Sequence, residues 1–338
     1  MAPVGALLER ARALNRERRY PALAVLLESV APDVRLREPE LGLLLADVSR
    51  RLGRTQDALE LATAVEAPLR RGGHDRLLRS RHNLVGMLLF ERGEIAAAER
   101  MWLALLEDAQ SGSDAEWIAR ATQNLGVVYT LTDRAQEAMT CHARAIAAYQ
   151  RLGHRRGLAQ AHQNLAIAYR DAGFGAQAEQ HFHEAASHAR ADGSADELAR
   201  VEQERALLIL LSGDVALART TAGNAMARFT RLGDPAGQAE VHRVLGLTAL
   251  RAGDADGARA ALHRALGAGG NRLLAAEVHV ALSALERALG NASAADTLDA
   301  EAEASFAALG AHAWGQRERV RVEQIIRAAT EDAQRTDD

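Results

Sequence analysis

ATQNLGVVYTLTDRAQEAM, residues 121–139, and AHQNLAIAYRDAGFGAQAE, residues 161–179, are the two stretches that decide the fold. The triplet that begins at Asn124 aligns with the triplet that begins at Asn164, at a shift of 40 residues. Each stretch reads as a helix, a short turn and the start of a second helix. A fixed period of this length is typical of helical hairpins that stack on one another.

The small residue that follows the leucine of each unit serves as an anchor for the period. The anchors are Ala46, Gly86, Gly126, Ala166, Ala206, Gly246 and Ser283, and a weaker unit is anchored near Ala11. Seven residues after each anchor lies a turn residue, which is Gly in six of the seven units and can therefore take the left-handed conformation that ends a helix. Twelve residues after each anchor lies Ala in all seven units, because two helices that cross closely need a small side chain there.

The pattern predicts an all-α protein, a single solenoid over residues 1–330 with about seven to eight hairpins. Residues 314–329 read as an amphipathic capping helix, and residues 331–338 as a frayed polar tail. Composition agrees, since only 4% of the 338 residues are aromatic and only 6 are Pro, which disfavours a β-rich fold.

Charge and cysteine content narrow the function classes. All 41 basic residues are Arg and the formal net charge is −4, which disfavours a nucleic-acid partner. No run of 18 apolar residues occurs, so we expect no membrane span. Cys141 is the only cysteine, which excludes an intramolecular disulfide and agrees with a cytoplasmic location.

The order NLG, a Tyr three residues later, a turn Gly and a fixed Ala resembles the tetratricopeptide repeat (TPR). The period of 40 residues resembles the long-helix branch found in Pins-type scaffolds, kinesin light chains, Rap-type regulators and maltose-regulon activators. This resemblance implies a right-handed α-α superhelix whose concave groove is lined by the first helix of each pair and binds peptides or proteins. Gly175 departs from the pattern, since an aromatic residue usually opens the second helix there.

Helical geometry selects the residues that should face the groove. Positions six, three and two before the anchor, and one, four and five after it, lie opposite the core at about 100° per residue. The candidate peptide-binding residues are Asn124, Asn164, Arg120, Gln123, Gln160, Gln163, Arg170, Arg200, Gln203 and Arg243. Amides suit a peptide backbone and Arg suits a carboxylate, so we expect an extended acidic ligand. The TPR resemblance assigns the backbone contact to Asn124 and Asn164 alone. The competing interpretation is a helix face that is polar only because it is solvated.

The histidines invite a metal site, but their positions favour packing. His82, His162, His242 and His279 each lie four residues before an anchor, at the edge of the core. His181, Glu184 and His188 share one helical stripe, which we interpret as a solvated outward face. We expect neither a metal nor a cofactor.

Motifs of catalysis are missing from the sequence. It contains no HExxH, no CxxC pair, no GxGxxG, no phosphate loop and no GxSxG. We interpret Cys141 as a small apolar filler rather than a nucleophile. The sequence therefore predicts a non-catalytic scaffold or adaptor that binds a protein or peptide, and the alternative is a peptide- or effector-responsive regulatory sensor. The sequence leaves the oligomeric state open.

Overall fold

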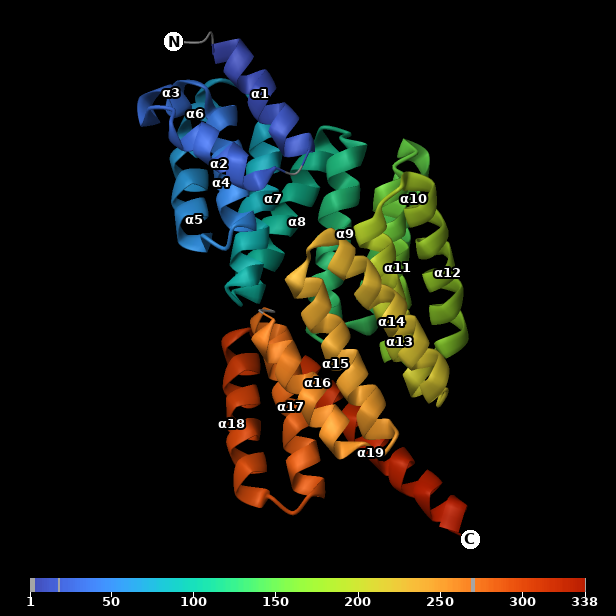
Figure 1. The fold of residues 1–338 in the computed structure, drawn as a ribbon. Helices are drawn as coiled ribbons and strands as arrows, with labels where there is room; N and C mark the ends of the chain where they lie inside the picture. Colours follow the sequence, from blue (N-terminus) through green and yellow to red (C-terminus); the bar gives the residue numbers. More distant parts are fainter. Residues whose placement is uncertain (1–3, 18, 269–270, 338) are drawn as a thin grey trace. The chain divides into compact units, whose positions relative to one another are not determined.

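The computed structural model describes residues 4–17, 19–268 and 271–337, and all regular structure within them is α-helical (Figure 1). The all-α class is therefore confirmed. Residues 1–3, 18 and 269–270 of the expected solenoid and residue 338 of the expected tail lie outside the described residues. None of the helices in the described part of the chain combines the length and the apolarity that a bilayer requires.

The chain forms two compact units, Met1–Ala121 and Thr122–Asp338, where the sequence predicts one solenoid over residues 1–330. Helix α9 crosses the boundary, and the 40-residue period continues through it without a break in composition. For this reason the periodic pattern gave no sign of the division.

Unit 1 contains short, irregular helices followed by regular hairpins. Its helices are α1 (Val4–Arg16), α2 (Tyr20–Glu28), α3 (Pro32–Arg37), α4 (Pro39–Arg51), α5 (Thr55–Ala64), α6 (Glu66–Arg71), α7 (Asp75–Glu91), α8 (Ile95–Ser111) and the first part of α9 (Ala115–Leu131). The second helix of the α4 hairpin ends early, at Ala64. Pro68 lacks the N–H that would bond to the Ala64 carbonyl, which explains why α5 and α6 are separate helices.

Unit 2 consists of regular hairpins that pair an odd-numbered helix with the following even-numbered helix. After the second part of α9 its helices are α10 (Ala135–Leu152), α11 (Arg155–Asp171), α12 (Gly175–Asp192), α13 (Ala195–Leu211), α14 (Val215–Leu232), α15 (Pro235–Arg251), α16 (Ala255–Gly267), α17 (Arg272–Ala288), α18 (Ala292–Ala308) and α19 (His312–Asp337). The odd-numbered helices from α11 to α17 pack on one another in turn.

The predicted turn and crossing residues are confirmed. The six predicted turn glycines have positive φ, from 73° to 98°, and Asp133 adopts the same conformation at 64°. All seven crossing alanines are fully buried: Ala58, Ala98, Ala138, Ala178, Ala218, Ala258 and Ala295. Close packing explains the glycine at the anchor position of the α7–α8 hairpin, because a Cβ at Gly86 would lie only 2.5 Å from Trp102 Nε1.

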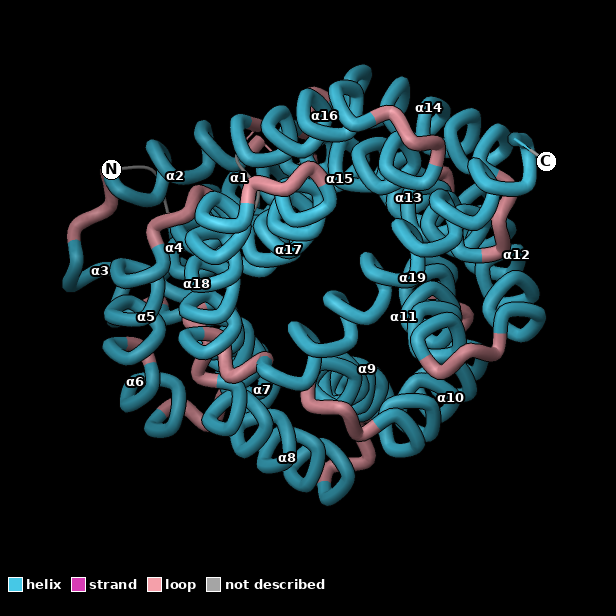
Figure 2. Tube along the Cα trace, turned by 90° about the horizontal axis from the view of Figure 1, so that it is seen from below, coloured by secondary structure: helices cyan, strands magenta, loops and turns pink. Residues whose placement is uncertain are grey.

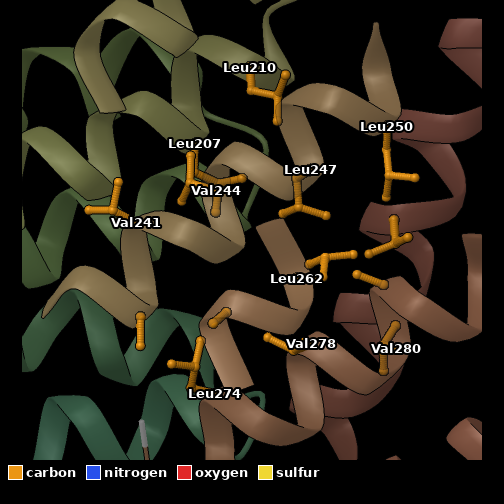
Figure 3. Packing of buried hydrophobic residues seen from close by; sticks show 14 of the residues in the cluster. Leu207, Leu210, Val241, Val244, Leu247, Leu250, Leu262, Leu274, Val278 and Val280 are labelled. Carbon is orange, nitrogen blue, oxygen red and sulfur yellow. The ribbon is translucent and has the colours of Figure 1, made fainter. Parts of the chain in front are cut away.

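The core of unit 2 runs between the two layers of helices and from each hairpin to the next. Figure 3 shows its aliphatic part, which includes Leu207 and Leu210 of α13, Val244 and Leu247 of α15, and Val278 of α17. Two phenylalanines from the even-numbered helices α14 and α18 also belong to this cluster: Phe229 and Phe306. Each fully buried side chain of this size contributes about 1.5–3 kcal/mol.

Seen along unit 2, the odd-numbered helices line the inner side of the curve and the even-numbered helices the outer side (Figure 2). We call the side formed by the odd-numbered helices the inner face. Helix α19 does not simply cover the end of the stack. It lies against this inner face and contacts α15 and α17 as well as α18.

Candidate functional site

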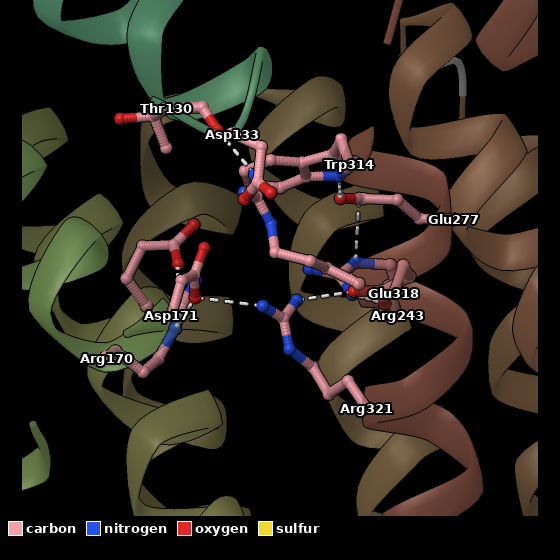
Figure 4. Close-up of polar contacts among 11 residues, drawn as sticks. Thr130, Asp133, Arg170, Asp171, Arg243, Glu277, Trp314, Glu318 and Arg321 are labelled. Carbon is pink, nitrogen blue, oxygen red and sulfur yellow. Dashed lines mark hydrogen bonds and ion pairs between the residues drawn. The ribbon is translucent and has the colours of Figure 1, made fainter. Parts of the chain in front are cut away.

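The inner face of unit 2 is occupied in part by α19, which begins two residues earlier than the predicted capping helix and continues to Asp337. Residues 331–337, predicted to be a polar tail, are therefore helical. Cap-like packing is present too, because Gly315 lies so close to Phe306 of α18 that a Cβ would approach its ring to 2.6 Å. Val322 and Ile325 of α19 join the hydrophobic core as well. A set of polar contacts of α19 reaches across the inner face (Figure 4).

The first polar contact joins α19 to α17. The Nε1 of Trp314 donates a hydrogen bond of 2.7 Å to Oε1 of Glu277. Glu277 lies six residues before the anchor Ser283, which is one of the positions predicted to face inward. Burial raises the pKa of Glu277 to about 8, and the neighbouring charge of Arg243 lowers it less than burial raises it.

The second contact joins α19 to α15 through two buried charges. Nη1 of Arg243 lies 2.8 Å from Oε1 of Glu318, and the two side chains are 4% and 1% exposed. Nε of Arg243 also lies 3.3 Å from Glu277. Burial lowers the pKa of Arg243, but the carboxylates of Glu277 and Glu318 outweigh burial and raise it overall. Burial also raises the pKa of Glu240 to about 7. Three carboxylates therefore compete for one guanidinium.

The third contact joins α19 to α11. Nη2 of Arg321 lies 2.9 Å from Oδ1 of Asp171, and Arg321 also pairs with Glu318 of its own helix. The same Asp171 oxygen accepts from Arg170 at 2.8 Å, and Arg170 bonds to Glu204 of α13 at 2.6 Å. Burial raises the pKa of Asp171, but the two arginines outweigh burial and hold the pKa below its usual value.

Two further ion pairs hold α19 near its beginning and near its end. Arg317 pairs with Asp133, in the turn after α9, and donates to the carbonyl oxygen of Thr130. Nη1 of Arg251, at the end of α15, lies 2.6 Å from Asp332. Polar contacts of α19 thus extend to the hairpins of α9, α11, α15 and α17.

The ten predicted peptide-binding residues separate into three groups. Arg170 and Arg243 lie in the α19 network and are buried. Arg120 belongs to unit 1, where it stacks over Trp117 at 5.5 Å and lines a cavity of about 270 Å³. The other seven lie on the odd-numbered helices of unit 2: Gln123 and Asn124 on α9, Gln160, Gln163 and Asn164 on α11, and Arg200 and Gln203 on α13.

Each predicted arginine already faces a carboxylate. Arg120 lies 3.0 Å from Glu116, and Arg200 lies 3.6 Å from Glu197, which also accepts a hydrogen bond of 2.6 Å from Gln160. Arg170 and Arg243 are paired as described above. The expectation of an acidic ligand depended on arginine charges that are left over, and these pairs reduce that surplus.

Sequence reasoning missed Glu277 and Glu318. Extending the inward-facing positions to the last repeat would have found Glu277. Glu318 lies in α19, outside the repeat register, so no periodic signal could place it.

One cavity beside α19, of about 340 Å³, is lined by residues of α17, α18 and α19. Two more cavities, of about 490 and 320 Å³, lie beside α19 on the inner face. Arg170, Gly173, Leu211 and Gln324 line both of them. Gly175 lines the smaller cavity, and a Cβ added there would meet only Leu208, at 3.9 Å. The side chain that is missing at this departure from the TPR pattern accounts for part of the empty volume.

The histidine stripe does not lie on a solvated outward face as predicted. Nδ1 of His181 lies 3.0 Å from Nδ1 of His162, and the His181 ring stacks on Tyr169. His188 stacks on His162 as well. The stripe therefore faces α11. Within the described residues, no group of three or more His, Cys, Asp or Glu side chains is placed to hold a metal ion.

The sequence matches no family model and no curated protein. Solved structures do resemble this fold. A Rap protein complexed with Competence and Sporulation Factor is 15% identical, with a TM-score of 0.64, and the match covers 96% of this chain and 99% of that chain. The Rap conjugation gene regulator of plasmid pLS20, in complex with the Phr* peptide, is 12% identical, with a TM-score of 0.63 and coverage of 96% and 97%.

A signal transduction ATPase with a tetratricopeptide repeat sensor, from Pyrococcus horikoshii, is 15% identical, with a TM-score of 0.55 over 77% of this chain and 41% of that chain. At these identities the likeness shows the fold, which is a TPR-like helical repeat. Membership of the Pins and kinesin-light-chain branch stays a prediction.

Proposed function

We propose that this chain is a non-catalytic regulatory protein that binds a segment of a partner protein on the inner face of unit 2. The observation that carries the proposal is α19 itself, a helix seated on that face by side chains from several hairpins. A surface that holds one helix by specific polar contacts has the chemistry to hold another. Rap proteins of similar fold have been solved with a bound factor or peptide, which supports the same proposal.

The ligand we propose carries both charges. Every predicted arginine is paired with a carboxylate, and Glu197, Glu204 and Glu277 lie on the inner helices beside them. A ligand that is acidic throughout would have to displace these carboxylates one by one. A segment that presents an acid and a base at the correct spacing can exchange pairs without leaving a buried charge uncompensated.

Catalysis has no support in the chemistry of the described residues. Burial raises the pKa of the Cys141 thiol, so it is poorly activated as a nucleophile. The strongly perturbed carboxylates of unit 2 already face arginines of the α19 network. Between the adaptor and the sensor, we favour the sensor, because the ligand surface already holds a segment of the chain.

Peptide display on the full chain tests this function. Peptides selected on the wild-type protein are titrated by fluorescence anisotropy against the double variant Asn124→Ala/Asn164→Ala. Loss of two hydrogen bonds to the bound segment, at about 1–3 kcal/mol each, should weaken binding tenfold or more. The matched control is Gln136→Ala/Gln150→Ala, which removes two exposed amides from the outer helix α10 and should leave binding unchanged. Equal loss in both variants, or no loss in either, contradicts an inner-face site.

A further inference from the structure

We infer that α19 is an internal substitute for a partner helix. The partner helix carries an aromatic N–H donor, a carboxylate four residues later and an arginine seven residues later. This inference rests on the proposed function, and it names both the ligand chemistry and the regulation of the same surface. A partner helix of this kind and α19 compete for one place.

Three of the polar contacts of α19 come from side chains on one side of the helix. Trp314, Glu318 and Arg321 are spaced by four and three residues, so they lie on one stripe of the helix. Their receptors come from three different hairpins and alternate in chemistry, since Glu277 accepts, Arg243 donates and Asp171 accepts (Figure 4). Only a helix of fixed register satisfies all three receptors at once, which makes the surface selective for helical segments.

Buried ion pairs make up a large part of the attachment of α19. Among the described residues of α19, the buried branched aliphatic side chains are Val322 and Ile325. Helix α17, by comparison, buries Leu and Val side chains at five positions. Buried ion pairs set register and specificity more than they add net stability, because desolvation offsets the attraction. Helix α19 is therefore held in a defined place with a smaller apolar contribution than α17 makes.

The space around α19 and its connection allow exchange. The cavities of about 490 and 320 Å³ flank α19, and the side chain of Val320 is 52% exposed beside the larger one. Gly310, which joins α18 to α19, has a φ of 62°, a conformation that glycine adopts without strain. Rotation about this residue would move α19 away from the stacked hairpins, and the packing of Phe306, Val322 and Ile325 opposes that movement.

Competition has a measurable consequence. A tethered helix acts at an effective concentration on the order of millimolar, so the closed chain should bind a free helix of the same chemistry weakly. Opening α19 removes this competition and raises the apparent affinity by the inverse of the open fraction.

The test uses a fluorescein-labelled peptide of residues 312–332, HAWGQRERVRVEQIIRAATED, titrated by anisotropy against three full-length proteins. Glu318→Arg places a second cation beside Arg243, and we expect it to open α19 and bind the peptide at least tenfold more tightly than wild type. Glu318→Arg/Arg243→Glu also removes the cation that receives the carboxylate of the peptide, so this double variant should bind the peptide no more tightly than wild type does, and tight binding to it would contradict the role of Arg243. Glu331→Arg, the same change at an exposed position of α19, is the matched control and should behave as wild type.

Hydrogen exchange of α19 reports opening independently, and circular dichroism reports folding. The inference is overturned if Glu318→Arg stays folded with α19 as protected as in wild type, or if α19 opens and the peptide binds no more tightly. If Glu318→Arg does not fold, the milder variant Glu318→Gln/Arg321→Gln replaces it. We expect this variant to bind the peptide threefold more tightly than wild type does, and no gain in affinity would overturn the inference.

Failure of this inference differs from failure of the proposed function. Display-selected peptides that lose affinity for Asn124→Ala/Asn164→Ala but bind wild type and Glu318→Arg equally would retain the inner-face function and overturn the role of α19. Selected peptides that are insensitive to every inner-face substitution would overturn the function itself.

Discussion

Arg243 of α15 and Glu318 of α19 form an ion pair of 2.8 Å although 75 residues separate them in the chain. Both side chains are almost fully removed from solvent, and Glu277 and Glu240 lie near the same guanidinium. One arginine thus neutralises a group of carboxylates that would otherwise repel one another. This relationship decides where α19 lies and how the stability of unit 2 responds to pH.

Replacing Arg243 should lower the free energy of unfolding more at high pH than at low pH. Arg243→Met leaves buried carboxylates without their cation, and breaking such a pair costs about 3–5 kcal/mol. At pH 6 the carboxylates with raised pKa are largely protonated, so the loss in free energy of unfolding should be smaller than at pH 9. Urea melts at the two pH values measure this difference. Arg228→Met breaks the less buried pair with Glu202 and should cost about 1 kcal/mol or less at both.

Glu277→Gln should stabilise the protein at alkaline pH. The folded-state pKa of Glu277 is raised to about 8 from an ordinary value of 4.5, so the folded state keeps the proton that the unfolded state releases. The stability that this group contributes is therefore present below pH 4.5 and is lost as the pH rises through about 8. The neutral amide still accepts from Trp314 and should gain on the order of 1–3 kcal/mol over wild type at pH 9.

Thermal melts at pH 6 and pH 9 measure the gain. Exposed Glu107→Gln serves as the control and should change the free energy of unfolding by less than about 0.5 kcal/mol at either pH. A Glu277→Gln variant whose deficit grew with pH would contradict a carboxyl that is neutral in the folded state.

His142→Leu should protect the fold against acid. The imidazole is fully buried against Gly126, and burial lowers its pKa from 6.5 to about 4. Because the folded-state pKa is depressed, its contribution to stability is present above pH 6.5 and is lost as the pH falls through about 4. For this shift in pKa, proton linkage lowers the free energy of unfolding by about 2 kcal/mol at pH 5. A Leu side chain does not titrate, so the variant should not show this loss.

The readout is the difference in denaturant midpoint between pH 7 and pH 5. His183→Leu, at an exposed position of α12, is the control and should retain the acid sensitivity of wild type. Equal acid sensitivity in His142→Leu would show that other groups dominate the transition, and His162, whose pKa burial also lowers to about 4, would be the next to test.

Two helical glycines should respond oppositely to alanine. Gly175→Ala adds a methyl group that meets only Leu208, at an ordinary van der Waals distance, and it improves helix propensity, so it should stabilise by about 0.5–1 kcal/mol. Gly126→Ala places its methyl group against the buried ring of His142 and should destabilise by about 1–3 kcal/mol. Differential scanning calorimetry of the two variants measures both effects. A Gly126→Ala protein as stable as wild type would mean that α9 and α10 can separate without cost.

The sequence by itself determined the repeat and its phase. Period, turn glycines and crossing alanines are local requirements of each hairpin, and each recurs at a fixed distance from its anchor. The same register places Arg170, Arg243 and Glu277 toward the inner side of unit 2, where α19 meets them. Such features follow from helical geometry alone, because 100° per residue converts sequence spacing into direction.

Tertiary structure alone decided what those side chains meet. The partners Glu318, Arg321 and Trp314 come from a helix outside the repeat, at separations of 37 to 150 residues from their receptors. Helix α19 is amphipathic like any capping helix, and its sequence does not say how far it reaches across the inner face. The position of α19 depends on which buried charges are paired with an opposite charge. Such pairs form in a low-dielectric interior, which exists only when the hairpins are already stacked.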